Sequence, residues 1–328
     1  MAASPSSHRP VLPCLAVECR CCASNRTFIS AADKKPVADG ATGLPSELLD
    51  PKAAVRPTPL GWVLVREPAS GSTYLLDPQS RRGKIQLPPL TGIDGDVLKY
   101  CNCLLSDQPS APAGCVVLLV ELIDRVIWYH HIGTSGWTRH AYDIGTQGDA
   151  HYTDEIHIVP IAACHGRFYF NCFKNEISVL EFCPGPVFSS IKLGAADVDW
   201  FRGTFHVFLV ESEGDLFAVS LKTPMKYQPP EFLDARVYKM DFSRKRWCLV
   251  DDLGDDRAFF VAPFYFGASC SAGKHGIQKN CVYFVRYLCD KSCIVCSDGV
   301  WQVHSLHDAE APSSSFLSAS WMLPIDPK

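Results

Sequence analysis

The sequence lacks a long apolar run. The longest uninterrupted candidate, Cys115 to Val120, is followed at once by Glu121. A membrane-spanning helix needs about 20 predominantly apolar residues in succession. We therefore predict no membrane-spanning helix and expect no membrane as a partner.

The N-terminal stretch lacks the features of a secretory signal. Pro5, Pro10 and Pro13 interrupt the segment that would have to be apolar, and Glu18 follows soon after. We therefore expect a cytoplasmic or nuclear protein. The same stretch is rich in Ser and Arg and poor in acidic residues, as organellar transit peptides are, so organellar targeting stays open as an alternative.

A large excess of charge of either sign is also missing. The chain has 31 Lys and Arg against 35 Asp and Glu, for a net charge of -4. Nucleic acids and anionic lipids attract surfaces with clustered Lys and Arg. We therefore do not expect nucleic acid as a partner.

The catalytic signatures that a sequence can reveal are missing as well. There is no Gly-x-Ser-x-Gly elbow and no Gly-rich phosphate loop with its Lys. We predict a protein that is not an enzyme and uses no cofactor. Catalytic groups brought together from distant parts of the chain would leave no such signature, so an enzyme with an axial site is the alternative.

Sustained helical periodicity is absent, and short runs rich in Val, Ile, Phe, Tyr and Trp recur in its place, separated by Gly, Asp, Ser or Pro. Each run has about the length of one ordinary strand. This pattern indicates an all-β fold. The runs are 61–66, 73–77, 115–122, 126–132, 167–173, 177–182, 205–210, 216–221, 237–242, 247–250, 258–262, 281–287 and 300–306.

Strands at this spacing form a sandwich, a barrel or a propeller, and internal repetition distinguishes them. A strand, a short polar turn and a Trp that opens the next strand occur at 128–137 and again at 237–247. A Gly that introduces an aromatic strand also recurs, as in Gly61-Trp62. We predict one kelch-like β-propeller domain over 1–328 with about six blades, or alternatively five or seven.

Two proline-rich stretches fit no strand pattern, and we predict loops over 39–59 and 223–231. The second is expected to project from the ring. It carries Met225 and Tyr227, with Phe232 immediately after, and these three are the candidate partner-binding residues because Met and Tyr offer apolar contact area. The alternative is a linker folded over the edge of a blade.

Cysteine is abundant, with 16 residues. Many lie within apolar strands, so we interpret them as reduced, buried, small hydrophobic residues. Two of them, Cys101 and Cys103, alternate on one strand and should share a face. The sharpest metal candidate is the group Cys289, Cys293, Cys296, His304 and His307. It contains only one pair with the spacing of a zinc knuckle, so we predict no metal site.

Carboxylate pairs are a second candidate for chemistry. They occur at Asp197 and Asp199, at Asp251 and Asp252, and at Asp255 and Asp256. Such pairs serve in acid–base catalysis or cation binding. Asp also accepts hydrogen bonds from backbone amides in tight turns. We therefore interpret those beside Gly254 as turn residues.

Several strings together resemble a plant family, the domain of unknown function 295 or KIB-type β-propeller, which is often found behind an F-box. Its most specific string here is Leu253-Gly254-Asp255-Asp256-Arg257-Ala258-Phe259-Phe260, with one Asp more than the family pattern. The others are 61–65, 75–80, 87–90, 237–242, 279–284 and Trp321-Met322-Leu323-Pro324. The resemblance covers most of the chain and implies a propeller.

The resemblance also implies a role in protein binding. Some relatives are ubiquitin-ligase adaptors that act through an F-box, and others are binding inhibitors of a kinase. The segment Leu44 to Leu49 looks like the opening of an F-box, but Pro51, Pro57 and Pro59 follow where helices are needed, so we predict a loop. We expect a monomer that binds a protein partner, with a ligase adaptor or kinase inhibitor as the alternative.

Overall fold

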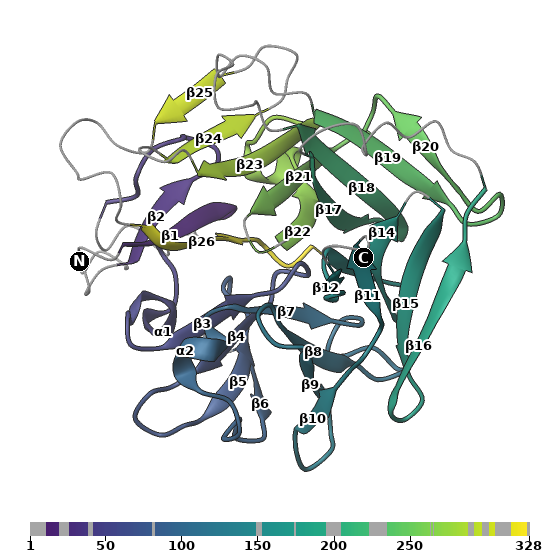
Figure 1. The fold of residues 1–328 in the computed structure, drawn as a ribbon. Coiled ribbons are helices and arrows are strands. Elements are labelled where there is room, and N and C mark those ends of the chain that lie inside the picture. Colours follow the sequence, from purple (N-terminus) through teal and green to yellow (C-terminus); the bar gives the residue numbers. More distant parts are fainter. Residues whose placement is uncertain are drawn as a thin grey trace, which may run out of the picture.

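The sheets of this chain form a six-bladed ring around a central axis in the computed structural model (Figure 1). The structure describes residues 11–19, 26–38, 42–80, 83–148, 153–173, 175–194, 205–222, 235–262, 264, 266–287, 292–296, 302–305 and 316–326. The predicted all-β propeller with about six blades is confirmed.

Four blades have four antiparallel strands each, with the strand nearest the axis first in the chain. They comprise β3 (Ala54–Pro57), β4 (Val63–Arg66), β5 (Thr73–Leu76) and β6 (Lys84–Leu87); β7 (Cys101–Leu105), β8 (Val116–Glu121), β9 (Val126–His131) and β10 (Thr138–Ala141); β13 (Ile161–Cys164), β14 (Arg167–Phe173), β15 (Glu176–Phe182) and β16 (Pro186–Lys192); and β17 (Phe205–Ser212), β18 (Asp215–Lys222), β19 (Ala235–Asp241) and β20 (Arg246–Val250). A small ribbon of β11 (Thr146–Gly148) and β12 (Thr153–Glu155) follows the second of these blades along the chain.

The remaining two blades depart from this order. In the fifth, β22 (Phe266–Ser271) is the inner strand, followed outward by β21 (Arg257–Ala262), β23 (Cys281–Tyr287), β24 (Ser292–Cys296) and β25 (Gln302–Ser305). β21 and β23 are neighbours in the sheet and run parallel. After β21 the chain first turns inward to form β22 and then crosses to the outer side of β21, where it forms β23. The closing blade joins both ends of the described chain, with β26 (Phe316–Met322) innermost, then β1 (Cys14–Cys19) and β2 (Arg26–Ser30).

Helix is confined to single turns in the described residues: α1 (Ser46–Leu49), α2 (Gly95–Leu98) and the 3-10 turn η1 (Gly273–His275). None of these helices has the length or apolar character needed to cross a bilayer. The predicted loop over 39–59 is wrong in part, since it contains α1 and the strand β3. Ala54 and Val55 are buried in blade contacts, and Pro57 lies at the strand end of an inner edge, where its missing N–H is tolerated.

Alternate side chains of one strand serve two different cores. Phe259 and Val261 of β21 pack toward the blade of β17–β20, whereas Ala258, Phe260 and Ala262 pack toward the closing blade. A hydrophobic cluster of this kind fills each junction between neighbouring blades. Because both faces of a blade are buried, its central strands read as continuous apolar runs rather than as alternating ones.

The innermost strands all run in the same direction along the axis. The chain leaves β3, β7, β13, β17, β22 and β26 at one end of the ring, and the segments that follow them gather there. We call this end of the axis the axial mouth. The turn between β8 and β9, which contains Ile123, lies at the other end of the ring.

Close packing of inner strands predicts one severe substitution. A Cβ atom added at Gly267 of β22 would lie 2.2 Å from the backbone oxygen of Leu209 in β17. Because both groups belong to backbones, we expect Gly267→Ala to lower the free energy of unfolding by about 1–3 kcal/mol. Chemical denaturation measures this change. Gly136→Ala is the control, because a Cβ there meets no atom within 4 Å; equal stability of the two variants would contradict the packing.

Candidate functional site

A cavity of about 620 Å³ opens at the axial mouth. Each of the six blades contributes residues to its wall. The lining residues are Pro59, Leu60, Asp107, Gln108, His165, Glu211, Glu213, Gly214, Asp256, Arg257, Ser269, Ser271, Lys274, Pro324 and Asp326. The cavity is therefore the candidate functional site.

Two tight turns of the same kind place His165 and Glu213 at the mouth. His165 has φ of 51° and is followed by Gly166 at 76°, and Glu213 has φ of 54° and is followed by Gly214 at 85°. Each pair joins two antiparallel strands with a two-residue loop, and positive φ at both positions is the geometry that suits the twist of a hairpin. The turns touch, because the Cys164 thiol donates to the Gly214 carbonyl at 3.4 Å.

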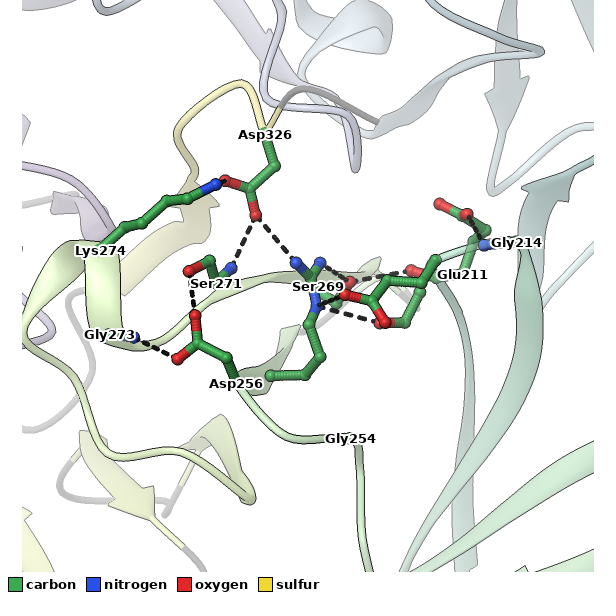
Figure 2. A network of polar contacts seen from close by, with 12 residues as sticks. Glu211, Gly214, Gly254, Asp256, Ser269, Ser271, Gly273, Lys274 and Asp326 are labelled. Atoms are coloured by element: carbon green, nitrogen blue, oxygen red, sulfur yellow. Dashed lines mark hydrogen bonds and ion pairs between the residues drawn. The ribbon is translucent and has the colours of Figure 1, made fainter.

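Arg257, at the start of β21, is the centre of the polar network in the wall. Figure 2 shows this network, with Asp256, Ser269, Ser271 and Asp326 labelled. Its Nη1 donates to Asp326 Oδ2 at 3.0 Å and its Nη2 to the Ser269 hydroxyl at 2.6 Å. Its Nε donates to the Ser212 hydroxyl at 3.2 Å. The side chain is only 11% exposed. The guanidinium therefore joins three separate segments around the cavity.

Asp326 holds the chain segment after β26 against the fifth blade. Besides the ion pair with Arg257, its Oδ2 accepts the backbone N–H of Ser271 at 2.6 Å, and Lys274 Nζ lies 4.0 Å from Oδ1. The preceding Ile325 N–H donates to Gln79 Oε1 of the first four-stranded blade at 2.8 Å. The segment thus bridges both neighbours of the closing blade along the rim of the mouth.

Asp256 belongs to the same wall but has different partners. Its carboxylate accepts the Ser271 hydroxyl and, at 2.6 Å, the Gly273 N–H. These hydrogen bonds hold the pKa of Asp256 below its ordinary value, and the bond from the Ser271 hydroxyl has the larger effect. Asp256 is therefore an ionised acceptor that fastens the β22–η1 connection to the start of β21.

The wall of the cavity has two sides of opposite character. Pro59, Leu60 and Pro324 supply an apolar side. The other side carries the charges: the carboxylates of Asp107, Glu211, Glu213, Asp256 and Asp326 and the cations of Arg257 and Lys274. Negative charge is in excess.

The candidates named from the sequence lie elsewhere or take structural positions. Met225, Tyr227 and Phe232 lie outside the described residues, as do Asp197, Asp199, Cys289 and His307. Only the backbone is described at Cys293, Cys296 and His304. The described residues contain no group of three or more His, Cys, Asp or Glu suited to a metal ion.

Seven of the nine cysteines whose side chains are described are buried, as the sequence predicts, whereas Cys183 is exposed and Cys248 is half-buried. Cys101 and Cys103 are buried in the same junction core, as the strand alternation predicted. Burial raises the pKa of Cys101 to about 12, so this thiol is not nucleophilic at neutral pH.

The turn interpretation of the acidic residues near Gly254 is right for one of them. Asp252 Oδ1 accepts the Gly254 N–H at 3.0 Å. For Asp256 it is incomplete, because its carboxylate accepts the hydroxyl of Ser271 on the neighbouring strand β22 and the N–H of Gly273. Sequence reasoning also missed His165 and Glu213 as site residues, although the pairs His165-Gly166 and Glu213-Gly214 between apolar runs are hairpin signals.

Three strings that carry the family resemblance meet at the mouth. Gly61 packs so closely that an added Cβ would lie 2.4 Å from the Pro324 oxygen, and Arg257 pairs with Asp326 just beyond that proline. The model of the KIB1-4 beta-propeller matches residues 40–309. The chain belongs to the KIB1-4 beta-propeller family. The family confirms the resemblance that the sequence strings predicted.

Solved structures resemble this KIB1-4 chain only distantly. The β-propeller domain of Cps50 (Swd1) from Myceliophteria thermophila is 9% identical, with 98% of each chain covered and a TM-score of 0.30. Dihydro-heme d1 dehydrogenase NirN is 12% identical over 98% of this chain and 77% of its own, with a TM-score of 0.32. The glutaminyl cyclase of Myxococcus xanthus is 9% identical over 83% and 91%, with a TM-score of 0.28. No match to a curated protein was found.

The position of Asp326 predicts a larger effect than an exposed ion pair would have. Asp326→Asn removes the nearest carboxylate, at 3.0 Å, from the Arg257 guanidinium, which is only 11% exposed. We expect the free energy of unfolding to fall by about 1–3 kcal/mol. Urea denaturation of both proteins measures the difference.

Asp143→Asn is the matched control for this prediction. Asp143 lies 3.0 Å from Arg125 but is 77% exposed, and Arg125 keeps a second partner in Glu155. We expect a change of at most about 0.5 kcal/mol. A loss at Asp326 no greater than at Asp143 would show that the pair does not hold the rim.

Proposed function

We propose that this KIB1-4 propeller is a non-enzymatic protein-binding domain that engages its partner across the face on which the axial mouth opens. The observation that carries this proposal is the composition of the mouth, where each of the six blades supplies part of one cavity. Loops on a rigid sheet scaffold can vary without disturbing its core. A partner on this face would therefore contact residues from several blades at the same time.

The mouth also gathers the carboxylates and the histidine that an axial enzyme would need. Two observations favour binding over catalysis. Asp256, with its pKa held low by Ser271 and Gly273, is a poor proton donor. Asp326 and Arg257 neutralise each other within the wall. These groups are used to hold segments of the rim together.

Both roles that the resemblance implies, ligase adaptor and kinase inhibitor, are forms of protein binding. The segment that looks like the opening of an F-box contributes to the propeller itself. Leu44 and Leu48 are buried in the junction between the closing blade and the blade of β3–β6. The described contacts favour neither role over the other.

Site-specific photo-crosslinking tests which face binds. A photoreactive amino acid is placed at His165 or Lys274, which are both exposed at the mouth, in the full chain expressed in cells that contain its partners. We expect both positions to crosslink the same protein, identified by mass spectrometry. Ile123, which is 75% exposed at the other end of the ring, is the control. Crosslinking from Ile123 and from neither mouth position would reject the proposal.

The stretch 223–231 provides a second, separate contact in this proposal, through Met225 and Tyr227 with Phe232 beside them. If they contact the partner, alanine at both Met225 and Tyr227 reduces partner recovery and leaves the melting temperature unchanged, because no core is disturbed. If the stretch instead caps a blade edge, the melting temperature falls. Full partner recovery by a stable double variant would remove these residues from the interface.

A further inference from the structure

We infer that the axial cavity receives a basic side chain, lysine or arginine, from a loop of the protein partner. This inference rests on the proposed function, because it names the chemistry of a contact on the mouth face. It depends on the charge balance of the wall, on the exposure of Glu213 and on the apolar side of the cavity.

Both cations among the described residues of the wall lie beside Asp326. Arg257 pairs with Asp326 at 3.0 Å, and its other two donor groups meet the hydroxyls of Ser212 and Ser269. Lys274 Nζ also faces Asp326, at 4.0 Å. One carboxylate thus lies between both cations. The described residues of the wall include five carboxylates against these two cations, and this excess makes the cavity complementary to positive charge.

Glu213 is the carboxylate best placed to meet an incoming cation. It sits at the tip of the turn between β17 and β18, and its side chain is 68% exposed. Its Oε1 lies 4.0 Å from Arg257 Nε, which is beyond hydrogen-bonding distance. The carboxylate therefore keeps capacity to accept hydrogen bonds from a ligand that enters the cavity.

The apolar side of the cavity distinguishes a basic side chain from a bare ion. Pro59, Leu60 and Pro324 lie there, and a proline side chain offers no hydrogen-bond donor. Lys and Arg have long aliphatic stems that pack on apolar surface while the charged end reaches polar groups. A bare metal ion would have no use for this side, and an acidic side chain would meet the excess of carboxylates.

Peptide titration tests the inference on the full, purified chain. The probes are short capped peptides of glycine and serine with one central lysine or arginine, and a dye at one end for fluorescence anisotropy. Norleucine in the centre keeps the alkyl stem without the charge, and glutamate reverses the charge. We expect the lysine or the arginine peptide to bind at least about tenfold more tightly than the norleucine peptide. The glutamate peptide should bind most weakly.

Variants of one turn locate the contact. Glu213→Lys should abolish binding of the basic peptides, and Glu213→Gln should weaken it by a factor of about three to ten. Asp215→Asn is the control, because it removes one negative charge from the same hairpin at a side chain that pairs with Lys239 at 2.6 Å. It should leave peptide affinity unchanged. All three variants should keep the circular dichroism spectrum of the parent.

Four outcomes would overturn the inference: no binding of either basic peptide, equal binding of the norleucine peptide, full binding by Glu213→Lys, or tighter binding of free spermidine than of the basic peptides. The last outcome would make the cavity a site for small organic cations instead. The proposed function has a separate test, because photo-crosslinking at His165 and Lys274 reports a partner on this face whichever side chain enters the cavity.

Discussion

Closure of the ring is the constraint on which the rest of the structure depends. Strand β26 pairs with β1, so residues from near the two ends of the chain form one blade between the first and the last of the others. Trp321 lies at this junction, fully buried, with its indole N–H donating to the Val261 oxygen at 3.1 Å. Its ring contacts Phe260 edge-on at 4.9 Å between centroids. Without this blade, the junction cores on both sides would lose one wall and be exposed to water.

One segment of the chain, 316–326, both closes the ring and forms part of the candidate site. The segment that anchors Trp321 in the core continues past Pro324, and its Asp326 completes the wall of the mouth by pairing with Arg257. The partners of Asp326 in this wall come from the fifth blade, where β22 follows β21 in the chain but lies nearer the axis. Because β22 returns toward the mouth next to the start of β21, Ser269 and Ser271 stand beside Arg257 and Asp256. The shape of the cavity therefore depends on the stability of the closing blade.

The sequence predicts most of the fold because the signals are local. Each apolar run is close to the length of a strand, and Gly or Asp marks the turns, so thirteen of the strands follow from spacing, and internal repetition then indicates about six blades. The features that the sequence does not predict are pairings between strands that are far apart in the chain. Nothing in Cys14–Cys19 indicates a partner some three hundred residues away. The parallel pairing of β21 with β23 is equally hidden, since a turn after a strand has the same composition whether the chain continues outward or inward.

The site was harder to predict than the fold for a related physical reason. Asp256 and Arg257 belong to one of the family strings and Trp321 to Pro324 to another, but only the ring brings the two strings together. Single residues at separate hairpin tips, such as His165 and Glu213, carry no spacing that marks them as partners. A propeller assembles its mouth from one short segment per blade, so the chemistry there can change by substitution at a turn while every junction core stays intact. The carboxylates of the mouth come from such segments and from Glu211 near the end of β17, and in our proposal their excess charge selects a basic side chain of the partner.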